Sequence, residues 1–187
     1  MLPVVVIWLA GVGAAGQFAK ISVTFDQVEQ VYPEAGARLG FALSILGLSG
    51  IFFGVVAGVL ASKIGMRRTL LGGLCLSVVV SFVQAFGLSF DLFLLSRVVE
   101  GLAHLAIVVA APTLIAKVSP PEKRAFSLTL LGTFYGVAFA LFAWLGRPLI
   151  EAYGLNAMYL VHGVWMTSSA LAVSAIGLPE EKSQRGA

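Results

Sequence analysis

Five polar side chains interrupt two apolar stretches of this sequence, and their types could do chemistry in a non-aqueous environment. Gln17 and Lys20 stand in the first stretch, and Arg97, Glu100 and His104 stand in the fourth. An ionisable group at the middle of a membrane-spanning helix costs about 2.5–3.5 kcal/mol on insertion scales, so it usually faces a partner or a polar cavity. These five residues are therefore the candidate substrate-binding residues.

The polar residues of the fourth stretch share one face if that stretch is helical. At about 100° per residue, Arg97, Glu100 and His104 align into a stripe in which Gly101 contributes no side chain. Such a stripe resembles the wall of a cavity.

The two polar sets lie at the same depth. Lys20 and Arg97 are each about five residues from the outer end of their stretch, roughly 8 Å deep at a rise of about 1.5 Å per residue, and Gln17 and Glu100 lie one turn deeper. We expect Glu100 to pair with Lys20 and with Arg97. Two interpretations stay open: a substrate site, for which two cations against one acid favour an anionic substrate, or a structural ion pair that contacts no ligand.

The elements that position these residues follow from composition. Of 187 residues, 59% are hydrophobic and 11% are charged, and the mean hydropathy is +0.97, whereas a soluble domain is roughly 45–50% apolar and about 25% charged. A water-soluble globule is excluded. Six stretches approach the roughly 20 residues that a helix needs to cross a bilayer. They lie near residues 3–25, 39–61, 69–86, 92–116, 125–146 and 156–178.

Backbone groups in lipid must find hydrogen-bond partners within their own segment, so these stretches are predicted to be helices. The chain is thus an all-α membrane protein, a single bundle of six transmembrane helices, multi-pass in a cytoplasmic or inner membrane. We read the first stretch as a retained helix that also serves as the insertion signal. Basic residues set the orientation: two connections carry only Arg38 and Arg147, and the opposite side carries eight bases, which predicts both termini in the cytoplasm. The eight are Lys63, Arg67, Arg68, Lys117, Lys123, Arg124, Lys182 and Arg185.

Several classes of function are disfavoured. The basic residues form no stripe or tail of the kind that binds nucleic acid. Cys75 is the only cysteine, and no metal-ligand cluster, carboxylate pair or nucleophile with a base occurs at usable spacing. We therefore predict no metal, no cofactor, no catalytic residue and no enzyme activity.

Glycines at helical spacing predict close packing between helices, because small residues let backbones approach in a membrane. The second stretch has Gly50, Gly54 and Gly58 four residues apart, the fifth has Gly132 and Gly136, and Gly101 lies in the fourth. The segment GVGAAG, residues 11–16, matches a dinucleotide-binding pattern, but it lies within an apolar span and not between a strand and a soluble helix. We interpret it as another packing face.

Two motifs resemble the N-terminal half of a major facilitator superfamily transporter. The segment GVLASKIGMRRTLL is similar to the loop pattern G-x-L-a-D-R-x-G-R-K, with Ser62 at the acidic position and Lys63 at the first arginine. The segment RVVEGLAHLA is similar to R-x-x-q-G, with Glu100 in place of the amide. The gating loop that the resemblance implies comprises Gly58, Ser62, Lys63, Gly65, Arg67 and Arg68.

The resemblance implies two three-helix repeats in inverted orientation, with the first and fourth helices lining a central cavity. It also implies secondary transport of a small solute, in which two six-helix halves rock about a site near the midplane. Because Ser62 replaces the carboxylate that latches the halves in the family, gating by that charge is not expected. The fifth span has no G-P-x-x-G-G motif after Gly136, so symport or uniport is favoured over antiport.

One six-helix bundle supplies only one side of such a cavity. Three arrangements remain open: a chain of about twice this length, pairing with itself or with a second half-size subunit, or a membrane assembly subunit that keeps the half fold without transporting. We favour a half that needs a second six-helix half as its partner.

Overall fold

The structure, a computed structural model, describes residues 1–179, and all regular secondary structure in that range is helical. It confirms an all-α fold. Connections between the helices are short, which keeps consecutive helices antiparallel. The elements are α1 (Leu2–Ser22), α2 (Phe25–Val31), the 3₁₀ segment η1 (Pro33–Leu39), α3 (Gly40–Ile64), α4 (Met66–Gln84), α5 (Phe90–Val118), η2 (Pro121–Lys123), α6 (Arg124–Gly132), α7 (Phe134–Tyr153) and α8 (Leu155–Ala175).

Five helical stretches among the described residues are long and apolar enough to cross a membrane. The third helix of the prediction becomes α4 and the fourth becomes α5, whereas α2 and η1 form a separate outer connection. The helix α8 is 21 residues long but is not among the five, so the sixth crossing stays a prediction. The five are Leu2–Ser22, Pro33–Ile64, Met66–Gln84, Phe90–Val118 and Pro121–Tyr153.

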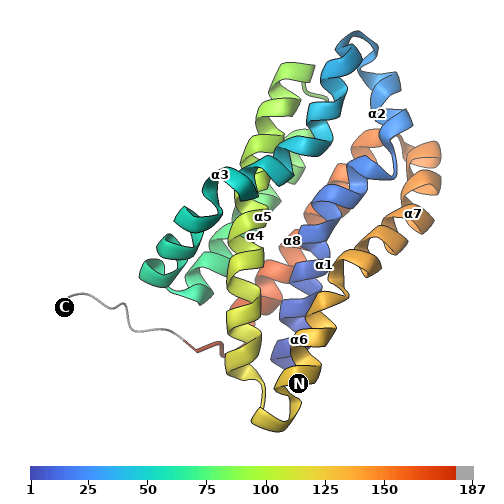
Figure 1. Cartoon of the computed structure of the whole chain (residues 1–187). Helices are drawn as coiled ribbons and strands as arrows, with labels where there is room; N and C mark the ends of the chain where they lie inside the picture. The colour runs from blue at the N-terminus through green and yellow to red at the C-terminus, as the bar shows by residue number, and fades with distance from the viewer. Residues whose placement is uncertain (180–187) are drawn as a thin grey trace.

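The helices form two layers (Figure 1). One layer is a row in the order α3, α5, α1, α7, in which each helix packs on the next. Behind it, α4 packs on α5, α8 packs on α1, and α4 and α8 pack on each other. The helices α1, α3 and α4 thus occupy places equivalent to those of α5, α7 and α8, as expected for two three-helix repeats. No other helix in residues 1–179 covers the side of the row opposite α4 and α8.

Glycine and proline set the sharp connections. Gly65, the only residue between α3 and α4, has φ +98°, and Gly154, between α7 and α8, has φ +80°; both values lie in the region that side chains disfavour. Pro120 and Pro121 follow the end of α5, because proline cannot continue a helix but suits the first turn of the next one. The two prolines therefore separate α5 from the helix that follows.

The fifth predicted span is not one straight helix. Between α6 and α7, Thr133 donates its amide hydrogen to Leu130 at a tighter 3₁₀ spacing, and its side-chain hydroxyl also bonds to the Leu130 carbonyl. The helix then continues past Pro148 to Tyr153, beyond the predicted end at residue 146.

The outer end of the bundle is tied together by polar contacts. Arg38 bonds to Asp91, and Arg147 donates to Asp26 at 2.7 Å. Tyr32 donates to the Leu88 carbonyl at 3.0 Å. Burial, together with the neighbouring Glu34 carboxylate, raises the pKa of the Tyr32 hydroxyl, which keeps it protonated and able to donate. Both basic residues predicted at the outer end are therefore paired with acids there.

The glycines divide into two groups. A methyl group on Gly101 would lie 2.6 Å from the Ser49 hydroxyl oxygen, and one on Gly73 would lie 2.9 Å from the Ala103 carbonyl. A methyl group on Gly13 would lie similarly close to Met166, and one on Gly16 would lie similarly close to Phe142. These positions need glycine because two helices touch there, which agrees with the predictions for Gly101 and for the GVGAAG segment.

The other predicted packing glycines touch no helix of this bundle. Nothing in the part of the chain that the structure describes lies within 4 Å of a Cβ placed at any of them, so the expectation is wrong within this chain. The reason is that α3 contacts α5 through a different set of small residues, which includes Ala42 and Ser49. The uncontacted glycines are Gly50, Gly54, Gly58, Gly132 and Gly136.

Candidate functional site

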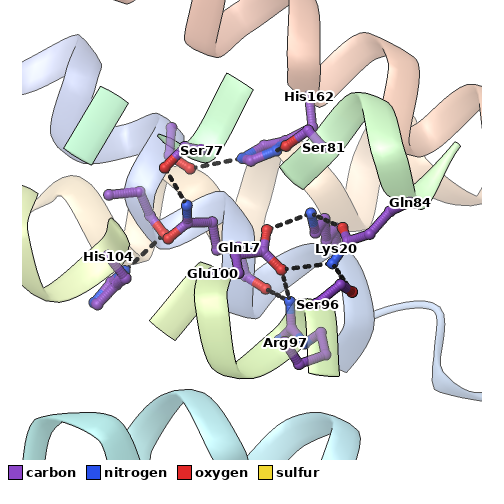
Figure 2. A network of polar contacts seen from close by, with 12 residues as sticks. Gln17, Lys20, Ser77, Ser81, Gln84, Ser96, Arg97, Glu100, His104 and His162 are labelled. Carbon is purple, nitrogen blue, oxygen red and sulfur yellow. Dashed lines mark hydrogen bonds and ion pairs between the residues drawn. The ribbon is translucent and has the colours of Figure 1, made fainter. Parts of the chain in front are cut away.

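The predicted charges on the first and fourth spans meet between α1 and α5. Lys20 Nζ lies 2.5 Å from Glu100 Oε1, and Arg97 Nη1 contacts the other carboxylate oxygen of the same residue. All three side chains are completely buried. Figure 2 shows them pointing toward one another at the centre of a polar cluster. Both predicted ion pairs are present, with one carboxylate shared by two cations.

The helix α4 completes this cluster with an amide. Lys20 Nζ donates to Gln84 Oε1 at 2.8 Å, and Gln84 Nε2 donates to Glu100 Oε2 and to the Ser96 hydroxyl, both at 3.0 Å. One turn deeper, Gln17 donates to the Ser77 hydroxyl at 2.7 Å. The charges on α1 and α5 are therefore bonded to the back layer, and they do not face the uncovered side of the row.

Arg97 also binds two backbone carbonyls of neighbouring helices. Its Nε donates to the Ala42 carbonyl on α3 and its Nη1 donates to the Gln17 carbonyl on α1, both at 2.9 Å. A planar guanidinium has five fixed N–H donors, so it can serve a carboxylate and two carbonyls at once. Arg97 thereby joins α1, α3 and α5. We call Lys20, Gln84, Arg97 and Glu100 the buried ion-pair network.

The fifth predicted residue, His104, lies apart from the buried ion-pair network. Its Nδ1 is 3.0 Å from the Ala14 carbonyl, and its Nε2 is 2.9 Å from the Tyr135 hydroxyl. A carbonyl oxygen only accepts, so Nδ1 carries the hydrogen and a neutral ring accepts from Tyr135 through Nε2. The Phe18 ring packs edge-on at a centroid distance of 5.0 Å. His104 therefore belongs to an aromatic group shared by α1, α5 and α7.

His162 joins the back layer to α1. Its Nδ1 is 2.7 Å from the Ser81 hydroxyl on α4, and its Nε2 is 2.9 Å from the Gly13 carbonyl. The side chain is buried, and its contacts are hydrogen bonds between helices. Across residues 1–179 no three His, Cys, Asp or Glu residues gather in a way that would hold a metal ion.

Comparison with known proteins identifies the family to which this chain belongs. The family profile described as Major Facilitator Superfamily matches residues 6–187. This chain belongs to the Major Facilitator Superfamily. It is 28% identical over 163 residues to "Inner membrane transport protein YajR" of Escherichia coli K12. It is 26% identical over 151 residues to "Quinolone resistance protein NorA" of Staphylococcus aureus MRSA252.

The alignments with these two relatives also show how much of each relative this chain covers. The aligned region covers 87% of this chain but 34% of YajR, and 81% of this chain but 39% of NorA. The chain thus spans little more than a third of the length of these curated relatives. Membership confirms the resemblance inferred from the two motifs and shows that the protein is a multi-pass integral membrane protein of a transporter family.

The loop motif of the superfamily lies where α3 turns into α4. Ser62, at the position of the family's acidic residue, donates to the Val59 carbonyl of its own helix at 2.7 Å. Lys63 and Arg68 are exposed, and Gly65 makes the turn. Of the eight bases predicted on this side, Lys182 and Arg185 lie outside the described residues. The role of the remaining loop residues in gating stays a prediction.

Sequence reasoning missed several residues of the site. Ser77 escaped notice because a single serine within an apolar span carries little hydropathy signal, and Gln84 because it lies at the end of its span. Tyr135 escaped because a tyrosine in an apolar stretch is common. A helix-wheel alignment of Ser77, Ser81 and Gln84, which are three or four residues apart, would have marked a polar face on α4.

Proposed function

We propose that this chain forms one six-helix half of a secondary transporter of the cytoplasmic membrane, and that the half works by alternating access. Superfamily membership supports transport of a small solute. The second half would be a further part of the same chain, a second copy or a separate subunit. The relatives' greater length favours the first of these.

The observation that carries the proposal is the unequal burial of helices that are all strongly apolar. In the most apolar stretch of α1, 67% of residues are buried within this chain, whereas in the stretches containing α3 and α7 the figure is 11% each. The first of these stretches carries Gly50, Gly54 and Gly58 on α3, and the other carries Gly132 at the end of α6 and Gly136 on α7; nothing in the described chain lies within 4 Å of a Cβ placed at any of them. Lipid does not require glycine on a helix surface, but a second helix at close range does. We infer that these faces contact the second half.

The buried ion-pair network serves this half as a rigid joint. Each of its charged side chains bonds to side chains or carbonyls of α1, α3, α4 and α5, one guanidinium nitrogen, Arg97 Nη2, has no partner, and none of the three has exposed surface. A satisfied polar network fixes the relative placement of the helices that share it. We infer that the network keeps the half a single body while the two halves rock against each other.

The substrate's charge remains a separate proposal. Two cations against one carboxylate leave the network with net positive charge, which would attract an anion at short range. Arg97 Nη2 is a buried donor without a hydrogen-bond partner, so an anion bound there would satisfy it, whereas Gln17 Oε1, which is also unpaired, is an acceptor and would need a donor. Comparing the flux of matched anionic and neutral solutes tests this preference, and equal flux of both would contradict it.

Reconstitution tests the proposed function. The purified protein in its native assembly is placed in phosphatidylcholine vesicles, and entry of isotope-labelled solute pools is followed with and without an imposed ion gradient. We expect saturable entry that is abolished by Gly54→Trp, with Val79→Trp as the matched control on the lipid-facing side of α4, where Val79 is 58% exposed. Absence of flux, together with a stable complex with an unrelated membrane protein, would favour the assembly-subunit alternative instead.

A further inference from the structure

A groove of about 470 Å³ lies between α3, α4 and α5, next to the loop that joins α3 to α4. The helix α3 crosses α5 obliquely (Figure 1). It packs there through Ala42, Leu46 and Ser49, whereas Ala61 is the one buried residue of α3 beyond Ser49. The groove occupies the part of α3 where close packing has ended. Its lining includes Phe53, Leu60 and Ile64 of α3, Arg68 and Leu76 of α4, and Leu102 of α5.

The groove has the length of one lipid leaflet. Along α4 it extends from Arg68 to Leu76, about 12 Å, and along α3 from Ile64 back to Phe53, about 16 Å, at a rise of about 1.5 Å per residue. One leaflet is half of a hydrocarbon core of about 30 Å, thus about 15 Å. An acyl chain that enters at the loop would therefore end near the midplane.

The groove is apolar and open to the bilayer. Of the described residues that line it, Arg68 and Thr69 alone are polar, and the Thr69 hydroxyl donates to the Gly65 carbonyl at 3.0 Å. Phe53 and Ile64 are each 47% exposed. Because a polar group buried without a hydrogen bond is costly, this surface suits a hydrocarbon chain and not a polar solute.

The end of the groove at the loop is positively charged. Arg68 and Lys63 are exposed there, and neither makes a hydrogen bond or an ion pair within residues 1–179. The sequence has no Asp or Glu between residues 35 and 90. The helix α4 begins at Met66, so the positive end of its dipole lies at the same place. This end therefore complements an anion at the depth of the lipid headgroups.

The groove is separate from the face of α3 that we assign to the second half. At about 100° per residue, Phe53 lies about 100° and Leu60 about 120° from Gly54, both in the same direction around the helix. A second half placed on the glycine face would leave the groove open to lipid.

We propose that this groove binds an anionic phospholipid of the cytoplasmic leaflet, with one acyl chain between α3, α4 and α5 and the phosphate at Arg68. Basic pockets between transmembrane helices on the cytoplasmic side suit such headgroups. Ser62 contributes because it bonds to its own helix and supplies no carboxylate to pair with Arg68. The bound lipid would hold α3, which carries Gly54, at a fixed distance from α5. This proposal does not depend on transport.

Photo-cross-linking tests the proposal on the purified protein in its native assembly, in vesicles of equal parts phosphatidylglycerol and phosphatidylcholine. Each sample contains a trace of one of these two lipids with a diazirine in its acyl chain, and mass spectrometry locates the cross-linked residues. We expect phosphatidylglycerol to label residues 53–64 and 68–76 about fivefold more than phosphatidylcholine does, which corresponds to about 1 kcal/mol for one basic residue near the membrane surface.

Two positions separate the headgroup from the acyl chain. Arg68→Gln should lower labelling by phosphatidylglycerol about fivefold and leave labelling by phosphatidylcholine unchanged, and Arg68→Lys should keep the preference. Gly72→Trp should lower labelling by both lipids, because Gly72 lines the groove and a Cβ placed on it has nothing within 4 Å. Arg124→Gln is the matched control for charge, since Arg124 is exposed at the start of α6 on the same predicted side, and it should change neither labelling.

Equal labelling of residues 53–64 and 68–76 by the two lipids would overturn the proposal. Absence of labelling there would also overturn it and would favour a helix of the second half as the occupant. The proposal fails as well if Arg68→Gln lowers labelling by phosphatidylglycerol no more than Arg124→Gln does. None of these results bears on solute flux, which is measured without a labelled lipid. Absence of flux with labelling that depends on Arg68 would contradict transport and leave the lipid site in place.

Discussion

The two sides of the helix row α3, α5, α1, α7 differ in what their polar groups touch. On the back, Lys20, Arg97 and Glu100 are fully buried and bond to one another and to α4. On the open side, Tyr135 is partly exposed and bonds only to a neutral histidine. The charged residues, which attract attention in a membrane sequence, belong to the sealed side.

This contrast shows that a charge within the membrane needs interaction partners, but that its presence alone does not identify a ligand site. Within this half, Glu100 has its partners, so we infer that it joins helices. Ligand contact requires exposed surface, and at mid-depth the exposed group is aromatic. Substitutions test this contrast, because their effects on the free energy of unfolding should differ between the two sides.

The largest effect is expected for Glu100→Gln. The amide removes the only countercharge between Lys20 and Arg97 and leaves two buried cations side by side, and breaking such a pair costs about 3–5 kcal/mol. The free energy of unfolding, measured by titration with sodium dodecyl sulfate in mixed micelles, should fall by that amount. Lys20→Met should cost less, because Arg97 and Glu100 would remain as a neutral pair.

Glu29→Gln serves as the control for this series, because Glu29 is an exposed acid on α2. Its unfolding free energy should match that of the wild type. An equal loss for Glu100→Gln and Glu29→Gln would show that the network does not hold the helices together.

A smaller effect is expected where the back layer packs on glycine. Gly73→Ala places a methyl 2.9 Å from the Ala103 carbonyl, and backbone cannot move aside cheaply, so the change should destabilise by about 1–3 kcal/mol. A Cβ placed on Gly72, the preceding residue, would have nothing within 4 Å. Gly72→Ala should leave stability unchanged or slightly raised, and equal losses at both positions would refute the assigned packing.

Ser81→Ala tests a neutral contact on the sealed side. It removes the hydroxyl that lies 2.7 Å from His162 Nδ1 and leaves a buried ring nitrogen unsatisfied, at a cost of about 1–2 kcal/mol. Ser168 is exposed on α8 and bonds to its own helix, so Ser168→Ala should cost nothing measurable in the same titration. The assignment fails if both serine variants unfold alike.

The smallest effect is expected on the open side. Tyr135→Phe removes one neutral hydrogen bond, to His104 Nε2, while His104 keeps its contact with the Ala14 carbonyl, so the loss should be about 0.5–1 kcal/mol. A loss as large as that of Glu100→Gln would mean that Tyr135 is a structural residue and that the two sides do not differ.

The sequence predicted the features that depend on burial in lipid. Apolar length located the helices, and the equal depth of Lys20 and Glu100 predicted their pairing, because an unpaired charge is so costly at that depth. The two motifs identified the superfamily. Substrate binding by Gln17, Lys20, Arg97, Glu100 and His104 stays a prediction.

Other features could not be predicted because they depend on which helix faces which. The glycines of α3 and of the stretch from α6 to α7 have the same spacing as glycines that pack, and spacing alone does not say which helix is the partner. The break at Thr133 arises from a local 3₁₀ hydrogen bond, and no proline at that position indicates it in the sequence. The bridge from Tyr135 to His104 crosses α1, so it exists only once three helices are placed.

The account depends most on the claim that the open faces of α3 and α7 receive a second six-helix half. Cysteine cross-linking in native membranes tests it directly, with Cys75→Ser as the background and single cysteines at Gly54, at Gly136 and, as control, at Val79. The account predicts that the cysteines at Gly54 and Gly136 cross-link to a segment that mass spectrometry identifies as another six-helix bundle, and that the one at Val79 does not. Equal, low cross-linking at all three positions would contradict it.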